Sequence, residues 1–316
     1  MEEVQRTIDQ LKAGAALFAC GEYLAHLGSL EQIEIYTKLS FERLRRKHED
    51  ISRVYAASYE NWNQTFYTVL LRFLGAPNNS GAFERLASKV HYGLILRYQN
   101  SLPTLEALLI GASGLLDCYP DDDYTSRLKS DFAYLAHKHN IEKMQPEEWV
   151  TRRIYPHNHP VLRMAQAAAF LSQHDFVLET LLKCRNPKDV SKLFGIGASE
   201  YWTNHFTPTH ISPDSVKRIG YSKANILGIN VIAQMQFAYG YYIGSEELHE
   251  RALSLLENTP AESNSKVNRW AVYGVRPTNA FETQALIQLG DCYCKQKRCE
   301  ECPIGRRIIK SVKSRL

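Results

Sequence analysis

Four of the seven cysteines lie within eleven residues near the C-terminus, in the segment CYCKQKRCEEC. They are Cys292, Cys294, Cys299 and Cys302. Thiolates are preferred ligands of structural zinc, and four of them hold an iron–sulfur cluster. The lysines and arginine between these cysteines would offset thiolate charge and lower the thiol pKa values. The segment is therefore a candidate metal site.

The spacing of the cysteines also limits that site. In a helix, side chains three or four residues apart share a face, so Cys292 and Cys294 should point in different directions. A compact loop with C-x4-C-x2-C spacing would then need a distant ligand, such as Cys184 or a histidine. The alternative is a metal-free loop whose cysteines pack as small apolar groups. We expect no cofactor, with zinc or an iron–sulfur cluster as the alternative.

Two glycines, Gly195 and Gly197, interrupt a helical pattern in DVSKLFGIGASEYW. Glycine lets a backbone approach a ligand closely, and the N–H groups that open the next helix can point at a phosphate. This turn is a candidate contact for a nucleic-acid backbone. In the alternative interpretation, the glycines only end one helix and begin another, with Ser199 as an ordinary cap.

The segment after the last cysteine, PIGRRIIKSVKSRL, is rich in basic residues and contains no acid. A basic terminal helix is typical of a phosphate-binding surface, although it can also serve only solubility. The predicted nucleic-acid contacts here are Arg306, Arg307, Lys310 and Lys313, followed by Arg315.

A second basic group lies in TRRIYPHNHPVLR. Arginine forks pair well with phosphate, so the segment is a candidate anion pocket. The alternatives are a metal site at His157 and His159, or a solvated loop with ion pairs to Glu147 and Glu148. The predicted anion-binding residues are Arg152, Arg153, His157 and Arg163.

Apolar residues recur at helical spacing along almost the whole chain, and alternating strand patterns with hairpin turns are missing. Leu39, Leu44, Ile51 and Val54, for example, mark one face of a helix. The sequence therefore predicts an all-α, multi-helix globular protein. A change of composition near residues 145–160 suggests two helical subdomains, residues 1–150 and 151–316.

The 316 residues carry a net charge of +4, and 44% are hydrophobic, which is ordinary for a globular chain. No uncharged apolar run reaches the length of about 18 residues needed to span a membrane. Glu2 and Glu3 stand where a signal peptide has basic residues. We therefore expect a cytoplasmic protein without membrane association, whose cysteines are reduced or bind metal.

Several phrases occur together in an informative order, including ERLRRKHEDI, NWNQTFYTVLLRFLGAPNN, RRIYPHNHPVLRMAQAAAFL and ALIQLGDCYCKQKRCEECPIG. Over roughly residues 15–310 the chain resembles the bacterial domain-of-unknown-function family 2851. That family has no established reaction. Its longer members place a nuclease-like segment before the helical part, and this chain is expected to lack that segment.

The C-terminal part also resembles, more weakly, the helix-hairpin-helix DNA glycosylases. ALIQLGDCYC is similar to the entry of their four-cysteine iron–sulfur loop, but no cysteine stands at the fourth position. The resemblance implies a glycosylase-like helical arrangement in the C-terminal half. It does not extend to catalysis, because Asp214, the aspartate at a comparable distance from the glycine turn, looks like a first-turn acid of a helix.

These observations favour a non-catalytic helical module that binds nucleic acid through the glycine turn and the basic tail. The alternative is an interaction protein that holds another protein, such as a separately encoded nuclease-like partner. A DNA-processing enzyme with a metal centre is the third hypothesis.

Overall fold

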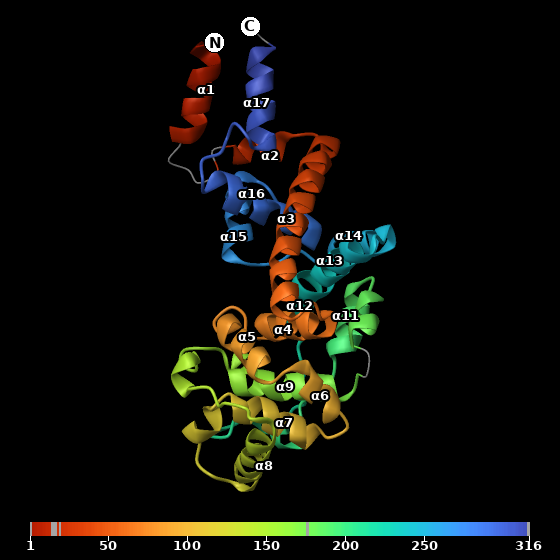
Figure 1. The fold of residues 1–316 in the computed structure, drawn as a ribbon. Coiled ribbons are helices and arrows are strands. Elements are labelled where there is room, and N and C mark those ends of the chain that lie inside the picture. The colour runs from red at the N-terminus through yellow and green to blue at the C-terminus, as the bar shows by residue number, and fades with distance from the viewer. Residues whose placement is uncertain (1, 14–17, 19, 175–176, 315–316) are drawn as a thin grey trace. The chain divides into compact units, whose positions relative to one another are not determined.

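The computed structural model describes residues 2–13, 18, 20–174 and 177–314, which are mainly helical (Figure 1). The all-α prediction is confirmed. The α-helices are α1 (Glu2–Ala13), α2 (Gly21–His26), α3 (Ser29–Ala57), α4 (Trp62–Leu74), α5 (Ser80–Lys89), α6 (Tyr92–Arg97), α7 (Leu102–Ala112), α8 (Asp123–His139), α9 (Pro160–Ser172), α10 (Val177–Leu182), α11 (Pro187–Phe194), α12 (Tyr221–Leu227), α13 (Ala233–Ile243), α14 (Glu246–Asn258), α15 (Ser265–Asn268), α16 (Ala280–Leu289) and α17 (Pro303–Lys313).

Short 3-10 and π segments connect these helices. The 3-10 segments are η1 (Leu115–Cys118), η2 (Pro146–Glu148), η3 (Pro156–Asn158), η4 (Glu200–Thr203) and η6 (Arg269–Tyr273). The π segments are η5 (Gly228–Ile232) and η7 (Gly290–Cys294). Within the described residues, every helix is too short or too polar to cross a lipid bilayer.

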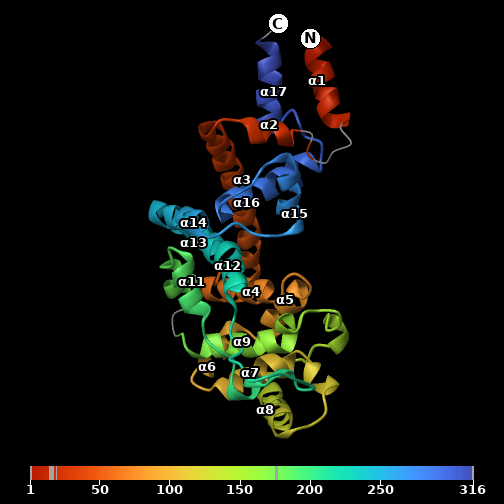
Figure 2. The ribbon, with the colours of Figure 1, turned by 180° about the vertical axis from the view of Figure 1, so that it is seen from behind.

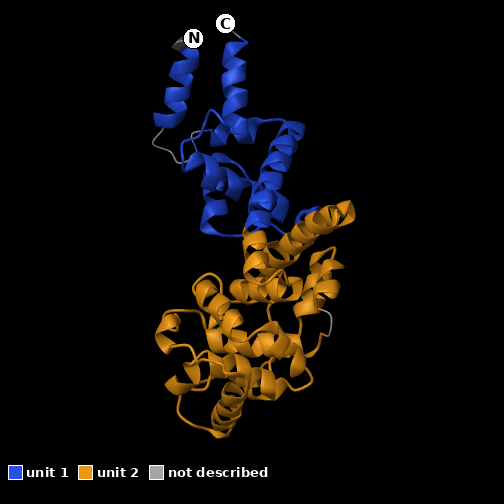
Figure 3. Ribbon diagram, viewed as in Figure 1, with its two compact units in different colours: residues 1–49, 253–316 blue, residues 50–252 orange. Residues whose placement is uncertain are grey.

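The chain divides into two compact units, coloured separately in Figure 3. Unit 1 comprises Met1–Glu49 and Leu253–Leu316, and unit 2 comprises Asp50–Ala252. Helices α3 and α14 each contribute to both units. The boundary expected near residues 145–160 lies inside unit 2. That the segments before and after residue 150 are separate subdomains stays a prediction.

Unit 2 is built around α4, α7 and α9. Phe66, Leu70 and Leu74 recur every fourth residue of α4 and are buried, as the apolar spacing predicts. Asn61 caps α4, because its side chain accepts the N–H groups of Asn63 and Gln64. Helix α4 packs on α5, and α7 packs on both α8 and α9, as Figures 1 and 2 show from opposite sides.

In unit 1, α3 lies against α16. The Ser40 hydroxyl donates to the carbonyl oxygen of Phe281 at 2.8 Å, and the buried Arg43 guanidinium donates to the side chain of Gln284. Leu39 and Leu44 of α3 are buried, as predicted. Polar contacts along a largely buried α16 therefore fix the register of the two helices.

One small antiparallel hairpin, β1 (His205–Thr207) and β2 (His210–Ile211), departs from the expectation of no hairpin strands. Thr207 pairs with His210, so Pro208 and Thr209 form the turn between them. Proline presets the backbone for such a turn. Strands of two or three residues are too short to show an alternating pattern.

Candidate functional site

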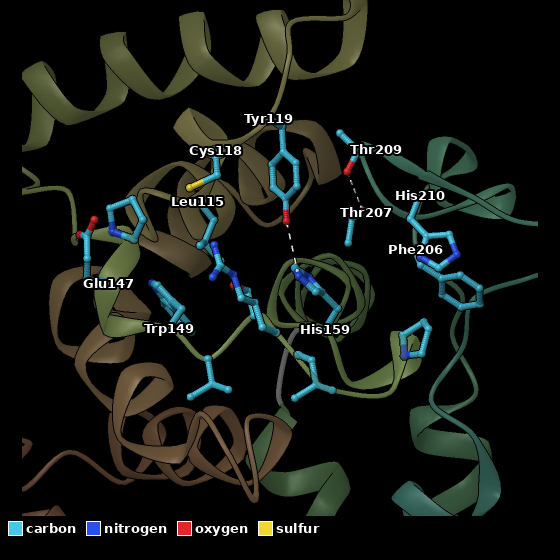
Figure 4. Close-up of a pocket in the computed structure, with 16 residues that line it drawn as sticks. Leu115, Cys118, Tyr119, Glu147, Trp149, His159, Phe206, Thr207, Thr209 and His210 are labelled. Atoms are coloured by element: carbon cyan, nitrogen blue, oxygen red, sulfur yellow. Dashed lines mark hydrogen bonds between the residues drawn. The ribbon is translucent and has the colours of Figure 1, made fainter.

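Unit 2 contains a cavity of about 760 Å³, shown in Figure 4. Glu147 and Trp149 lie on one side of it, and Phe206 and His210 of the β-hairpin lie on the other. Trp149 is held in place because its indole N–H donates to the carbonyl oxygen of Ser113 at 2.9 Å. The size of the cavity and its aromatic walls are typical of a small-molecule site.

A tyrosine and a histidine meet in this cavity. The Tyr119 hydroxyl points at the His159 ring in Figure 4, with 3.5 Å between the oxygen and Nε2. His159 is 7% exposed, and its Nδ1 has no hydrogen-bond partner among the described residues. Burial, with a smaller effect of His210, lowers the pKa of His159 to about 4, and burial raises the pKa of Tyr119. Both groups are therefore neutral near pH 7.

The predicted anion-binding residues have different surroundings. Arg152 is exposed and lines the cavity. Arg163 is 4% exposed and donates to Gln166 Oε1 at 2.8 Å and to Asn158 Oδ1 at 2.7 Å. Burial lowers the pKa of Arg163 to about 10. Arg163 therefore holds Asn158 and Gln166 and is buried, and its role in an anion pocket stays a prediction.

The other two predicted residues lie outside the cavity lining. Arg153 is exposed and has a positive φ of 57°. His157 stacks on Tyr155 and meets Phe206 edge-on. The alternative was that Glu147 and Glu148 form ion pairs with the basic residues of this loop. Glu148 instead pairs with Arg85, at 2.7 Å. Only Arg152 of the predicted set therefore lines the cavity, and an anion-binding role for the set stays a prediction.

A second cavity of unit 2, about 550 Å³ in volume, contains a buried acid that the sequence analysis missed. Glu106 is 1% exposed and accepts a hydrogen bond of 2.7 Å from the Ser199 hydroxyl. Burial raises the pKa of Glu106, and the hydrogen bonds oppose that rise. A single acid within the apolar helix TLEALLIGA was the available signal. Ser199 thus partners a carboxyl group instead of capping a helix.

The turn at Gly195 and Gly197 is not part of a helix-hairpin-helix. Helix α11 ends at Phe194, and the four-residue 3-10 segment η4 follows where a second α-helix was expected. The Ala198 N–H donates to the carbonyl oxygen of Lys217 at 3.1 Å. A Cβ at Gly197 would lie 2.5 Å from Val216 Cγ1. Close packing against Val216 therefore explains why residue 197 is a glycine. The nucleic-acid role of the turn stays a prediction.

The basic tail forms helix α17 in unit 1. Arg307 pairs with Glu31 at 2.7 Å and with Glu34 at 2.5 Å, both in α3. Arg306, Lys310 and Lys313 are exposed. The Arg306 Nε donates to the carbonyl oxygen of Glu300 at 3.1 Å. The predicted contact Arg315 lies outside the described residues. The described part of the tail, up to residue 314, therefore contains one anchoring arginine and three exposed cations.

The C-terminal cysteines separate as their spacing predicts. The Cys292 thiol lies 3.5 Å from Gln288 Oε1, whereas the Cys294 thiol hydrogen-bonds with Cys20, which the sequence analysis missed. All cysteines are free thiols. As the side chains stand, no three described His, Cys, Asp or Glu residues are arranged to hold a metal ion. Cys184, the distant ligand considered from sequence, is buried in unit 2 beside the carbonyl oxygen of Thr180.

Comparison with known proteins identifies a family for this chain, but that family has no described function. Residues 1–265 match the family described as protein of unknown function (DUF2851). No curated protein and no solved structure matches the chain, so the comparisons do not confirm the glycosylase resemblance. The family match covers most of the chain and ends before the cysteine segment. The chain belongs to the DUF2851 family of proteins of unknown function.

Proposed function

We propose that this protein binds the phosphate backbone of nucleic acid through α17, without chemistry on the bases. The observation that carries the proposal is the exposure of Arg306, Lys310 and Lys313. Their spacing of four and then three residues places them on one face of the helix. A helix rises about 1.5 Å per residue, so the stripe spans about 10 Å. Successive phosphates of one strand advance about 3.4 Å along the duplex axis, so three cations match about three phosphates.

Helix α17 is held in a fixed orientation by its remaining arginine. Arg307 pairs with two carboxylates of α3. The side chain of Arg307 is 28% exposed, so each pair contributes at most about 1 kcal/mol. Its role is to set which face of α17 is free. The proposal does not require a nucleic-acid contact at the Gly195–Gly197 turn, because packing against Val216 already accounts for Gly197.

Duplex binding by a matched pair of triple variants tests the proposal. In the first variant, Arg306→Gln, Lys310→Gln and Lys313→Gln remove the stripe. In the control, Lys38→Gln, Arg45→Gln and Lys188→Gln remove three exposed cations elsewhere and change the net charge equally. Fluorescence anisotropy with a labelled duplex should show at least about tenfold weaker binding for the stripe variant. The control should bind almost like the wild type.

Two outcomes would reject the proposal. Equal weakening in both variants would mean that only net charge matters. A wild-type protein without measurable duplex affinity that co-purifies with another protein would favour the rival hypothesis of an interaction protein.

A second candidate function is small-molecule binding in the 760 Å³ cavity of unit 2. Its support is the unpartnered Nδ1 of the buried His159, with Arg152 at the same cavity. Such a site suits a planar molecule with a negative group, which Trp149 and Phe206 would flank. Nucleoside monophosphates should raise the unfolding temperature of the wild type but not of Arg152→Gln. An equal rise in both would exclude this arrangement.

A further inference from the structure

A stack of three rings lines the second cavity of unit 2, which has a volume of about 550 Å³. The ring centres of Tyr124 and Tyr201 lie 3.9 Å apart, and those of Tyr201 and His205 lie 4.2 Å apart. The Tyr201 hydroxyl donates to Asp122 Oδ2 at 2.7 Å, and Asp122 is the N-terminal cap of α8. Contacts within the protein therefore hold this wall in place before a ligand binds, which lowers the entropic cost of binding.

Glu106 of α7 contributes a buried carboxyl group to the same cavity. The side chains of Ser199, Tyr124 and Trp202 donate hydrogen bonds to it, with 2.7 Å between the Ser199 hydroxyl and Oε1. A carboxylate has about four acceptor positions, so at least one of them stays open to a ligand. No ion pair joins Glu106 to a cation among the residues that the structure describes.

Arg127 of α8 contributes the opposite charge to this lining and is exposed. Its guanidinium carbon lies 5.8 Å from the centre of the Tyr124 ring. Burial raises the pKa of Glu106, and the charge of Arg127 is one of the effects that oppose this rise. Within the described part of the chain, Arg127 has no carboxylate partner. Its guanidinium can therefore accept a ligand carboxylate through two parallel hydrogen bonds.

We propose that this cavity binds a free α-amino acid. The ammonium group of the ligand would donate to Glu106, and its carboxylate would pair with Arg127. A cation that reaches a buried carboxylate offsets the cost of removing that charge from water. A volume of about 550 Å³ lies within the usual range of small-molecule sites. Leu102 and Pro103 of the lining offer an apolar surface to the ligand side chain.

The charges of the lining disfavour ligands with a single charged group. A carboxylate without an ammonium group would be repelled by Glu106 and by Glu200, an exposed acid of the same lining. An amine without a carboxylate would leave Arg127 without a partner from the ligand. A molecule that carries both groups meets both requirements.

The amino-acid site is separate from the nucleic-acid surface proposed above. All residues of its lining belong to unit 2, whereas α17 belongs to unit 1. Amino-acid binding is also measured without nucleic acid present. Failure of one proposal therefore leaves the other untouched.

Binding of the common L-amino acids to the full-length protein tests the proposal. At millimolar concentration, at least one should raise the unfolding temperature, because a ligand of the folded state stabilises it. Isothermal titration should then find one site per chain. Analogues of that amino acid without the carboxylate or without the ammonium group are the matched ligands; for leucine, they are isoamylamine and isocaproate. Each analogue should bind at least about tenfold more weakly, because one charge-assisted contact is lost.

Three variants locate the site. Glu106→Gln keeps the shape of the side chain without its charge, and Arg127→Gln removes the opposite charge. Each should weaken amino-acid binding by at least about tenfold. Arg97→Gln removes an exposed arginine of α6 outside the cavity and should bind like the wild type. Because Arg127 is exposed, Arg127→Gln should fold even if Glu106→Gln does not. In Arg127→Gln, the amino acid should bind no better than its analogue without the carboxylate.

Three results would overturn the proposal. The first is a wild type whose unfolding temperature and titration heat respond to none of the amino acids. The second is equal affinity of the amino acid for the wild type and for Arg127→Gln. The third is equal affinity of the wild type for the amino acid and for its analogue without the carboxylate, which would mean that the cavity binds simple amines.

Discussion

The cysteines near the start of α17 in unit 1 and the His159 cavity of unit 2 both bury titratable groups, but their surroundings act differently on charge. Burial leaves His159 and Tyr119 neutral, with little to compensate a charge on either. In unit 1, backbone N–H groups donate to the Cys302 sulfur, and Cys20 shares a hydrogen bond with the Cys294 thiol. Burial alone keeps a titratable group neutral, whereas hydrogen-bond donors beside a buried group oppose that effect.

A pair of glycine substitutions tests whether the cysteine loop is as constrained as its contacts indicate. Gly305→Ala places a Cβ against the Cys299 carbonyl oxygen, and we expect a loss of about 3 kcal/mol or more. Gly290→Ala meets nothing closer than Phe18 Cε1 at 3.6 Å and should change stability by about 1 kcal/mol or less. Urea unfolding of both variants measures the difference. Similar midpoints would show that the loop relaxes easily.

The neutral histidine of unit 2 should appear in the pH dependence of stability. The ordinary pKa of 6.5 falls to about 4 in the folded protein. Between these values the unfolded chain binds more protons, so the free energy of unfolding rises with pH from about 4 to 6.5. The full change is about 3 kcal/mol, at 1.36 kcal/mol for each pKa unit.

His159→Gln is the control for this dependence. Glutamine cannot titrate, so the acid limb measured by urea unfolding between pH 4 and 6.5 should become flatter by most of that amount. An unchanged slope in His159→Gln would mean that other groups cause the acid sensitivity, and that His159 is not kept neutral by its burial.

Much of the fold could be predicted because helical periodicity is local. The buried face of α3, marked by Leu39 and Leu44, follows from spacing alone. The divergence of Cys292 and Cys294 is also a local property of a helix. The hairpin at Pro208 was missed because two-residue strands show no alternation.

The candidate sites depend on contacts between distant segments, which a single sequence does not reveal. Cys20 stands far from the other cysteines and carries no motif of its own. Arg163 has the residue type of an anion ligand, but the packing of α9 turns it inward. Beyond Gly197, backbone pairing with residues 217–218 replaces the second helix that the local pattern suggested. In each case tertiary contacts decided what spacing left open.

The salt dependence of duplex binding tests the central claim, that α17 contacts phosphates, most directly. Each phosphate contact contributes about 0.9 to the slope of log K against log salt concentration. Replacing Arg306, Lys310 and Lys313 by glutamine should therefore reduce the magnitude of the slope by about 2.7. The control with Lys38, Arg45 and Lys188 replaced should keep the wild-type slope. A stripe variant with the wild-type slope would contradict the account.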